Sequence, residues 1–341
     1  MFCRQRRIPV FLGFVRLLSN LFSKPGESGF PLQLAKAAPE HLTAALECVL
    51  STTGRPADTA QMVLFMQSAR ARGIDVSQVW VALRQGRVQY AILPMLIPGR
   101  TMMLISGNLR KEQVPAAGEL LARVVQEYAK LDLSLMQTLV ASGDQALIGV
   151  YEAGGFSRLT ELIYLEASPR TLAWKLPDSS WDMVPYSEQA HGQFTQAILA
   201  SYQGTLDCPE LEGVRKIEDV IAGHRAAGLF DPRSWFMLRQ SQRPAGVLLL
   251  AKIPGTDALE LVYIGLAPFA RGQGIGRELM KLALASAVTA KCGRLTTAVD
   301  FRNTPAVQMY YHAGMQRIGS RLALMRVIHR PGEFDAQSIP K

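Results

Sequence analysis

The sequence predicts an α+β protein, mixed α/β in character, built as two tandem domains with the same order of elements. Two observations support this prediction. Similar residues recur at one fixed offset along the chain, and the second half alternates between helical and extended periodicities. The chain has 341 residues, which is enough for two domains of ordinary size.

The repeat is clearest in the stretches VYEAGGFSRL and MYYHAGMQRI, where Tyr151 and Tyr310 are 159 positions apart (310 − 151). The same offset relates Gly155 to Gly314, Arg158 to Arg317, Glu119 to Glu278 and Leu120 to Leu279. Because the offset holds from a predicted helix start to a predicted strand start, it indicates an ancient duplication.

The two halves meet in the Pro- and Ser-rich stretch ASPRTLAWKLPDSS. We therefore expect a leader (1–30), a first domain (31–168), a linker (169–181), a second domain (182–330) and a tail (331–341).

The leader is basic at its start and then apolar. Arg16 interrupts the apolar part and no small-residue cleavage site follows, which disfavours a secretory signal. We expect a poorly ordered basic leader or an early start codon. A signal peptide and a weak anchor at an anionic membrane surface are the alternatives.

The composition is that of a globular protein, with 48% hydrophobic and 19% charged residues. No apolar run reaches the roughly 18–20 residues that a membrane span needs. The four cysteines are scattered without a CxxC pair, so we expect a reducing, cytoplasmic setting, no disulfide framework and no metal site. The net charge of +9 suits an anionic small ligand, and no basic-aromatic motif indicates nucleic-acid binding.

Elements of the second domain follow from periodicity and turn residues. The predicted order is strand 181–186, helix 187–202 capped by Ser187, helix 216–228, a hairpin of strands 234–240 and 245–253, strand 258–266, a long helix after the glycines, strand 293–300, a short helix from Thr304 and strand 317–327.

The stretch GLAPFARGQGIGRELM, from Gly265 to Met280, places glycines directly before the long helix. A helix N-terminus offers unpaired N–H groups, and glycines allow the backbone to curl so that several of them meet one anion. We therefore interpret the stretch as a main-chain diphosphate site with Arg271 as an added cation. It is neither a P-loop nor a dinucleotide fingerprint. A Gly-rich turn that only caps the helix is the alternative.

The sequence resembles the GNAT superfamily of acyl-CoA N-acyltransferases at this point. The matching motifs are LAPFARGQGIG and, behind it, NTPAVQMYYHAGM, in the order and separation of the family. Leu266 replaces the usual Val and Met315 the usual Phe. The tandem layout and the pattern E-x-x-x-x-G-[VL]-x-P are similar to those of mycothiol synthase.

The resemblance implies a strongly twisted sheet, split between the strand ending at Leu266 and the strand ending at Val299, with acetyl-CoA as co-substrate in the split. It assigns the cofactor contacts to Ile264, Gly265 and Leu266 for pantetheine, to Arg271, Gly272, Gln273, Gly274, Ile275, Gly276 and Arg277 for the pyrophosphate, and to Asn303 for the cofactor arm or the local turn.

Direct attack of an amine on a thioester needs a base for the amine and an acid for the leaving thiolate. Tyr310 is the expected acid, by its motif position; a core tyrosine is the alternative. Glu260 is the expected base, on one strand face with Val262 and Ile264; a solvated edge charge, or a water chain from Asp300 or another acid, is the alternative.

The loop SYQGTLDCPELEG falls where the family covers its acceptor. Tyr202, Asp207 and Cys208 are the expected acceptor-binding residues, with Asp207 as counter-charge to the amine. The alternative is an ordinary polar loop.

At the repeat offset, residues 112–117 of the first domain correspond to residues 271–276, the predicted diphosphate cradle. Glu112 then stands for Arg271, Pro115 has no N–H, and the loop has no glycine. We therefore expect that the first domain does not bind CoA by this route, and that it braces the second domain or walls the acceptor pocket.

The sequence thus predicts an acetyl-CoA-dependent N-acetyltransferase for a small-molecule or peptide primary amine, active in the second domain. A non-catalytic acyl-CoA-binding or scaffold protein is the alternative, and a membrane-surface protein guided by the leader is the third.

Overall fold

The computed structural model describes residues 30–51, 55 and 57–328. The predicted leader, except for Phe30, and the predicted tail lie outside the described residues.

The first half contains helices and strands in the following order. They are β1 (Gln33–Lys36), α2 (Leu42–Val49), α3 (Thr59–Ala71), β2 (Trp80–Arg84), β3 (Arg87–Ile97), β4 (Thr101–Ser106), a 3-10 turn η3 (Lys111–Gln113), α4 (Val114–Tyr128), β5 (Leu135–Val140), α5 (Gln145–Ala153) and β6 (Ser157–Ala167).

The second half repeats this order. Its elements are β7 (Trp181–Pro185), α6 (His191–Tyr202), η5 (Pro209–Leu211), α7 (Ile217–Ala226), β8 (Trp235–Gln240), β9 (Arg243–Lys252), β10 (Ala258–Leu266), η7 (Pro268–Ala270), α8 (Ile275–Thr289), β11 (Arg294–Asp300), α9 (Thr304–His312) and β12 (Gln316–Val327). The mixed α/β fold and the predicted elements of this half are confirmed.

The hairpin turn is tighter than the sequence suggested. Ser241 and Gln242 alone form it, with φ of 48° and 69°, and Arg243 already belongs to β9. Two consecutive left-handed residues match the right-handed twist of the flanking strands.

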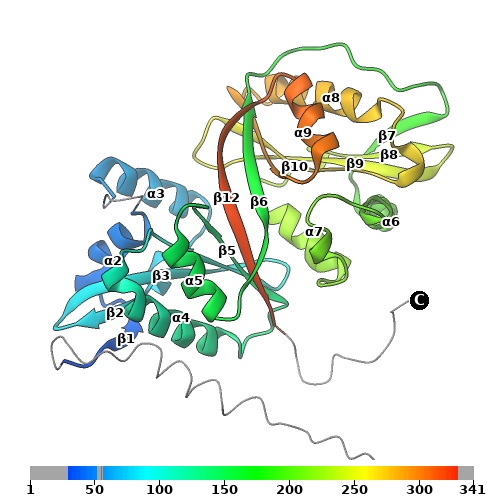
Figure 1. Cartoon of the computed structure of the whole chain (residues 1–341). Helices are drawn as coiled ribbons and strands as arrows, with labels where there is room; N and C mark the ends of the chain where they lie inside the picture. Colours follow the sequence, from blue (N-terminus) through cyan, green and yellow to red (C-terminus); the bar gives the residue numbers. More distant parts are fainter. Residues whose placement is uncertain (1–29, 52–54, 56, 329–341) are drawn as a thin grey trace, which may run out of the picture.

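The described strands form one 12-stranded sheet in the order β1-β2-β3-β4-β5-β12-β6-β11-β10-β9-β8-β7. The two halves therefore exchange their last strands: β12 pairs with β5 of the first half, and β6 pairs with β11 of the second. β6 and β12 run side by side and antiparallel between the two lobes (Figure 1). Two separate sheets were expected. The exchange joins them into one sheet, because β12 covers the edge of the first half at β5 and β6 covers the edge of the second half at β11.

Helices cover both faces of each half. In the second half, α8 and α9 pack on one face with β6 and β11, while α6 and α7 pack on the other with β8 and β9. The exchanged strands contribute to both cores: Leu165 of β6 is buried in the second half and Leu324 of β12 in the first. The domain boundaries drawn at 168 and 182 stay a prediction.

The repeat offset is visible in the coordinates. α5 and α9 begin and end 159 positions apart, at Gln145–Ala153 and Thr304–His312. Each helix is followed by a glycine in the left-handed region, Gly155 with φ of 82° and Gly314 with φ of 85°. A side chain is strained at such a φ, so both halves need glycine there.

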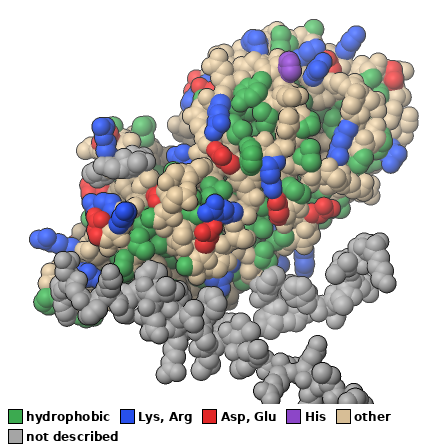
Figure 2. All heavy atoms as spheres, in the orientation of Figure 1, with side chains coloured by type: hydrophobic (Ala, Val, Ile, Leu, Met, Phe, Trp, Pro, Cys, Tyr) green, Lys and Arg blue, Asp and Glu red, His purple; other side chains and the backbone are tan. Residues whose placement is uncertain are grey.

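Basic and acidic side chains are interspersed on the face of the molecule shown in Figure 2. That face shows no continuous basic stripe of the kind that tracks a nucleic-acid backbone.

Candidate active site

Strands β10 and β11 pair over three residues and then separate. Ala258–Glu260 lie in parallel register with Arg294–Thr296. Farther along, β10 remains paired only with β9, and β11 only with β6, so their facing edges carry main-chain groups without a strand partner. A cavity of about 200 Å³ occupies this split. The split lies where the sequence predicted it.

Several predicted residues line this cavity. They are Asp207, Ile264, Gly265, Leu266, Arg271, Asn303 and Tyr310. Gly265 is required by close approach, because a Cβ there would lie 2.6 Å from both the Ser201 Oγ and the Tyr263 Oη atoms. The three β10 residues predicted for pantetheine pair with β9 on one side only, which leaves their other edge toward the split.

The glycine loop adopts the curled backbone that the sequence predicted. Gly272 and Gly274 have φ of 74° and 77°, and Gly274 is the N-cap of α8. The amides of residues 272–276 donate to no main-chain or side-chain acceptor among the described residues. The amide of Arg271 is already bonded to the Pro268 carbonyl at 3.2 Å, so the free amides begin one residue later than expected.

Arg271 places its guanidinium differently from the expectation. Its Nε atom donates to the Leu266 carbonyl at 3.0 Å, and its Nη atoms donate to the carbonyls of Gly204, Ser201 and Gln203 at 2.8–3.1 Å. The side chain therefore fastens the end of α6 to the end of β10 and is not directed at an anion. Its planar, multiply donating head suits this role.

Arg277 and Gln273 flank the free amides. Arg277 is exposed in the first turn of α8 and has no carboxylate partner among the described residues. The Gln273 Nε2 atom donates to the Phe269 carbonyl at 2.7 Å, and this bond ties the glycine loop to the preceding 3-10 turn η7. Free amides at a helix N-terminus beside an unpaired cation fit a diphosphate.

Asn303 acts on the local turn, one of its two expected roles. Its side-chain oxygen accepts a hydrogen bond from the Ala306 amide at 3.3 Å and so caps α9.

Tyr310 lies at the bottom of the split and is 3% exposed. Burial raises the pKa of its hydroxyl, the Asp207 charge raises it further, and a hydrogen bond with Thr297 opposes them. In the first half the equivalent Tyr151 is also buried, and its hydroxyl shares a hydrogen bond of 2.9 Å with the Ser106 hydroxyl. The tyrosine therefore has a packing role in both halves.

Glu260 shares its strand face with only one of its two expected neighbours. A β-bulge between Leu261 and Tyr263 shifts the register of β10, so Glu260 shares its face with Val262 and Tyr263, and Ile264 turns to the other face. Burial raises the pKa of Glu260, and Arg72 of the first half lowers it. Glu260 sits at the closed end of the split, on the side covered by α6 and α7.

Asp207 lies in the loop between α6 and η5. Burial raises the pKa of its carboxyl, and the neighbouring Asp300 charge raises it too. The hydrogen bond from the Asp300 amide and the Arg302 charge lower it, but by less. Tyr202 packs edge-on against Tyr263 with ring centroids 5.9 Å apart. The pKa of the Cys208 thiol is raised by burial and by three nearby carboxylates, so this cysteine is a neutral thiol and no nucleophile.

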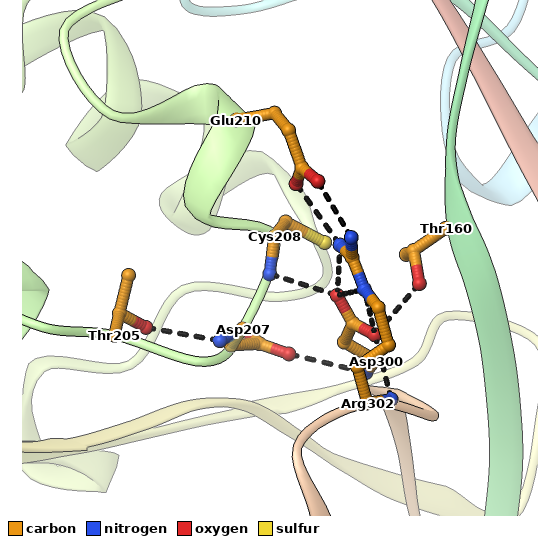
Figure 3. A network of polar contacts seen from close by, with 7 residues as sticks. All are labelled: Thr160, Thr205, Asp207, Cys208, Glu210, Asp300 and Arg302. Carbon is orange, nitrogen blue, oxygen red and sulfur yellow. Dashed lines mark hydrogen bonds and ion pairs between the residues drawn. The ribbon is translucent and has the colours of Figure 1, made fainter.

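A network of polar contacts holds this loop against the end of β11 (Figure 3). Asp300 is fully buried and accepts hydrogen bonds from the Thr160 hydroxyl at 2.6 Å, the Cys208 amide at 3.1 Å and Arg302 at 2.7–3.2 Å. Arg302 also forms two bonds to Glu210, at 2.6 and 2.9 Å. Burial alone would raise the pKa of Asp300, but these bonds together hold it below its usual range, so Asp300 is a structural anion and not a base.

Sequence reasoning missed several residues of the site. They are Thr160, Ser201, Tyr263, Thr297 and Arg302. Only Arg302 had a local signal in the sequence, because it lies two residues after Asp300 and just before the N-cap of α9. The others meet through pairings between distant strands, which no local pattern encodes.

The first half differs where the cradle would lie. η3 and α4 form nearly continuous helix from Lys111, in place of a curled loop, and Pro115 is the second residue of α4. Arg110 pairs with Glu112 at 3.2 Å. A cavity of about 830 Å³ at this end is lined by Arg110, Gln113 and Asp144 among others.

The first half contacts α7 and the residue that follows it in the second half. Arg100 lies 3.8 Å from Asp219 of α7, and the Arg72 Nη2 atom donates to the Ala227 carbonyl at 3.2 Å. α7 in turn carries His224, whose ring stacks on Tyr263 at 5.3 Å. Burial, with the Arg215 charge, lowers the pKa of His224 to about 4, so this histidine is neutral.

The part of the chain that contains this site resembles a known protein family. Residues 200–315 match the profile of the Acetyltransferase (GNAT) family. This segment is a GNAT acetyltransferase domain. It begins at the end of α6 and ends after α9, and so contains the split, the free amides and Tyr310.

Solved structures with the same fold cover most of the chain. A GCN5-related N-acetyltransferase from Sphaerobacter thermophilus matches with a TM-score of 0.60 at 14% identity, over 89% of this chain and 98% of its own. A tandem GNAT protein from the clavulanic acid biosynthesis pathway matches with a TM-score of 0.51 at 13% identity, over 88% of this chain and 100% of its own. No curated protein matches. The likeness to mycothiol synthase in particular stays a prediction.

No helix among the described residues has the length and apolar character to cross a bilayer. Among them, no group of three or more His, Cys, Asp or Glu side chains is arranged to hold a metal ion.

Proposed function

We propose that this chain is an acetyl-CoA-dependent N-acetyltransferase that acetylates a primary amine of a small molecule or peptide, with its active site in the second half. The observation that carries the proposal is the run of five amides, residues 272–276, that have no partner among the described residues and directly follow Arg271, which lines the split. Such a run, next to an unpaired arginine, is built for a diphosphate.

The residues around the split fit the rest of the coenzyme. The open edge of β10 around Ile264, Gly265 and Leu266 offers main-chain groups to the amide-bearing pantetheine arm, apart from the Leu266 carbonyl that Arg271 already binds. Arg277 supplies charge to the phosphates from solvent. Arg271 shapes the site by holding the end of α6, and the thioester supplies the acetyl group.

Two side chains handle protons in this proposal. The raised pKa of Tyr310 keeps its hydroxyl protonated at neutral pH, so it has a proton to give to the leaving sulfur. The sequence predicts Glu260 as the base, and burial raises its pKa as that role requires, although Glu260 does not line the cavity in the split. Tyr202, Asp207 and Cys208 form the acceptor-side loop.

The first half serves as a brace in this proposal. Its helical segment at Glu112–Pro115 offers no comparable set of amides, and its contacts with α7 support the acceptor side.

One observation favours a second candidate, a non-catalytic acyl-CoA-binding protein. A buried tyrosine persists at the equivalent position, Tyr151, in the half without a cradle, so Tyr310 need not be catalytic. Both candidates bind CoA and only the enzyme turns it over.

The deciding experiment incubates the protein with isotope-labelled acetyl-CoA and a cell extract, and follows the label by mass spectrometry. Transfer to an amine, dependent on the protein, supports the enzyme. CoA binding without transfer or release of the CoA thiol favours the binding protein.

A further inference from the structure

We propose that Asp207 is the carboxylate that takes the proton from the attacking amine, and that the contacts among Thr160, Glu210, Asp300 and Arg302 position it. This inference rests on the proposed N-acetyltransferase function and moves the base from Glu260 to the loop of Asp207.

Location is the first argument. Asp207 lines the split together with Tyr310, the proposed acid, and its charge acts on the hydroxyl of Tyr310. Glu260 does not line that cavity, because it lies where β10 and β11 are still paired, opposite Thr296. A base must lie within hydrogen-bond reach of the reacting amine, directly or through one water.

The carboxylate of Asp207 also has a free oxygen. Its Oδ1 atom accepts a hydrogen bond from the Asp300 amide at 3.1 Å, which fixes its orientation. Its Oδ2 atom accepts no hydrogen bond from the described residues, and it is not among their buried unpartnered atoms. That oxygen is left for a ligand in the cavity.

The three carboxylates of the cluster have different partners. Asp300 and Glu210 both bind the Arg302 guanidinium, which holds the pKa of each below its usual range and makes them poor bases. Asp207 forms no ion pair, and its pKa is raised. A carboxyl whose pKa is moved toward neutrality is the better proton acceptor at physiological pH.

The loop that carries Asp207 is fixed on both sides. The Asp207 amide donates to the Thr205 hydroxyl at 3.1 Å, and the Cys208 amide donates to Asp300. Cys208 has a φ of 47°, a left-handed conformation that a non-glycine residue adopts only when its surroundings impose it. Preorganisation of this kind is expected where a side chain must meet a reacting atom.

The repeat gives an independent argument. At the offset of 159, Asp300 corresponds to Ala141 and Arg302 to Gly143. The first half therefore folds the same strand and helix without these charges, and Ala141 and Gly143 line its open cavity. Among the described residues, the network is found only in the half that has the cradle. We therefore infer that it contributes to the ligand site and is not required for the fold.

The proposed step balances as follows. The amine nitrogen forms a bond to the acetyl carbon, and the carbon–sulfur bond breaks. One proton passes from nitrogen to the Asp207 carboxylate, and the Tyr310 hydroxyl gives one to the sulfur. Asp207 then releases its proton to solvent and Tyr310 takes one back, which leaves an amide and the CoA thiol.

The test uses the full chain with acetyl-CoA and spermidine, glucosamine, lysine and a dipeptide as acceptors, and follows the free thiol colorimetrically. We expect Asp207→Asn to keep CoA affinity within about twofold, and to lower kcat/KM by about 100-fold or more with loss of the acid limb of the pH profile. Asp207→Glu should recover part of the rate. Glu212→Gln is the matched control, because Glu212 is an exposed carboxylate of the same segment.

Four results would overturn the assignment. Asp207→Asn could keep both the rate and the acid limb of the parent, or Glu260→Gln could show the predicted loss in its place. A parent that binds CoA but releases no thiol with any acceptor refutes the proposed function itself, and Asp207 with it. If Asp207→Asn no longer binds CoA, the Asp207→Glu variant decides: a shifted acid limb supports the assignment and an unmoved one refutes it.

Discussion

Asn303 and Asp144 cap equivalent helices in the two halves, 159 positions apart (303 − 144). The Asn303 side chain accepts the Ala306 amide at 3.3 Å, and the Asp144 side chain accepts the Leu147 amide at 3.0 Å. The repeat has kept these caps and changed the loop before the preceding helix. Features shared by both halves therefore report on the fold, and features found in the second half alone report on ligand binding.

The repeat supplies a matched pair of tyrosine variants. Tyr310→Phe and Tyr151→Phe each remove one buried tyrosine hydroxyl, which in Tyr151 is hydrogen-bonded to Ser106 and in Tyr310 lies beside Thr297. Each should therefore lower the free energy of unfolding by about 1 kcal/mol in urea titrations. Only Tyr310→Phe should lower kcat, by about 100-fold, with CoA affinity unchanged. Equal activities of the two variants would leave Tyr310 with a packing role alone.

A second pair tests the curled loop. Gly274 and Gly86 have φ of 77° and 70°, and a Cβ at either position meets nothing within 4 Å. Alanine at either should cost roughly 1–2 kcal/mol of backbone strain. At Gly274 the loop can relieve this strain by leaving the shape that binds the diphosphate, so CoA affinity measured by calorimetry should fall about 5- to 30-fold. Gly86→Ala should bind CoA like the parent, and the loop assignment fails if both variants do.

Local chemistry explains what the sequence could predict. Gly272 and Gly274 signal a left-handed loop, and Asn303 signals a cap three residues before the amide that it binds. The repeat offset could be read from identical residues such as Tyr151 and Tyr310. These features depend on residues close in sequence or on direct similarity.

What the sequence could not predict depends on strand order and side-chain direction. The bulge at Val262, which moved Ile264 to the face opposite Glu260, has no signature in a run of apolar residues. The Arg271 guanidinium binds carbonyls at the end of α6, about 70 residues away along the chain. Thr160 reaches Asp300 only because β6 crosses into the second half.

Arg271 and Arg277 should respond in opposite ways. Arg271→Lys replaces a fork that meets four carbonyls by a single ammonium, so the free energy of unfolding should fall by about 2 kcal/mol. Arg277→Gln removes an exposed, unpaired charge and should change stability by less than about 0.5 kcal/mol. It should weaken CoA binding about threefold or more at low salt, and the difference should shrink as salt is added. If Arg271→Lys weakened CoA binding without a loss of stability, Arg271 would be a phosphate-binding residue as the sequence predicted.

The Glu210–Arg302 pair should make stability depend on pH. The Arg302 hydrogen bonds lower the folded pKa of Glu210, so the stability that this group contributes is present above its unfolded pKa of about 4.3 and is lost as pH falls through the folded value. Because both side chains are more than a third exposed, Glu210→Gln should cost only about 0.2–1 kcal/mol at pH 7. Urea titrations should show the difference shrinking as pH falls below the unfolded pKa. Glu212→Gln should show no such convergence, and a pH-independent cost in Glu210→Gln would contradict the ion-pair account.

Gly99 tests whether the first half braces the acceptor side. Its φ is 87°, and a Cβ there would overlap with the Asp219 carbonyl oxygen in α7, which must move. Gly99→Ala should therefore lower the free energy of unfolding by about 2–5 kcal/mol, from overpacking and left-handed strain together. Because α7 positions His224 against Tyr263, KM for the amine should rise while CoA affinity, set by residues 272–277, stays unchanged. Gly73→Ala, with a φ of 66° and open space around it, provides the strain without the overlap. If both variants leave KM for the amine unaltered, α7 does not depend on the first half for its position.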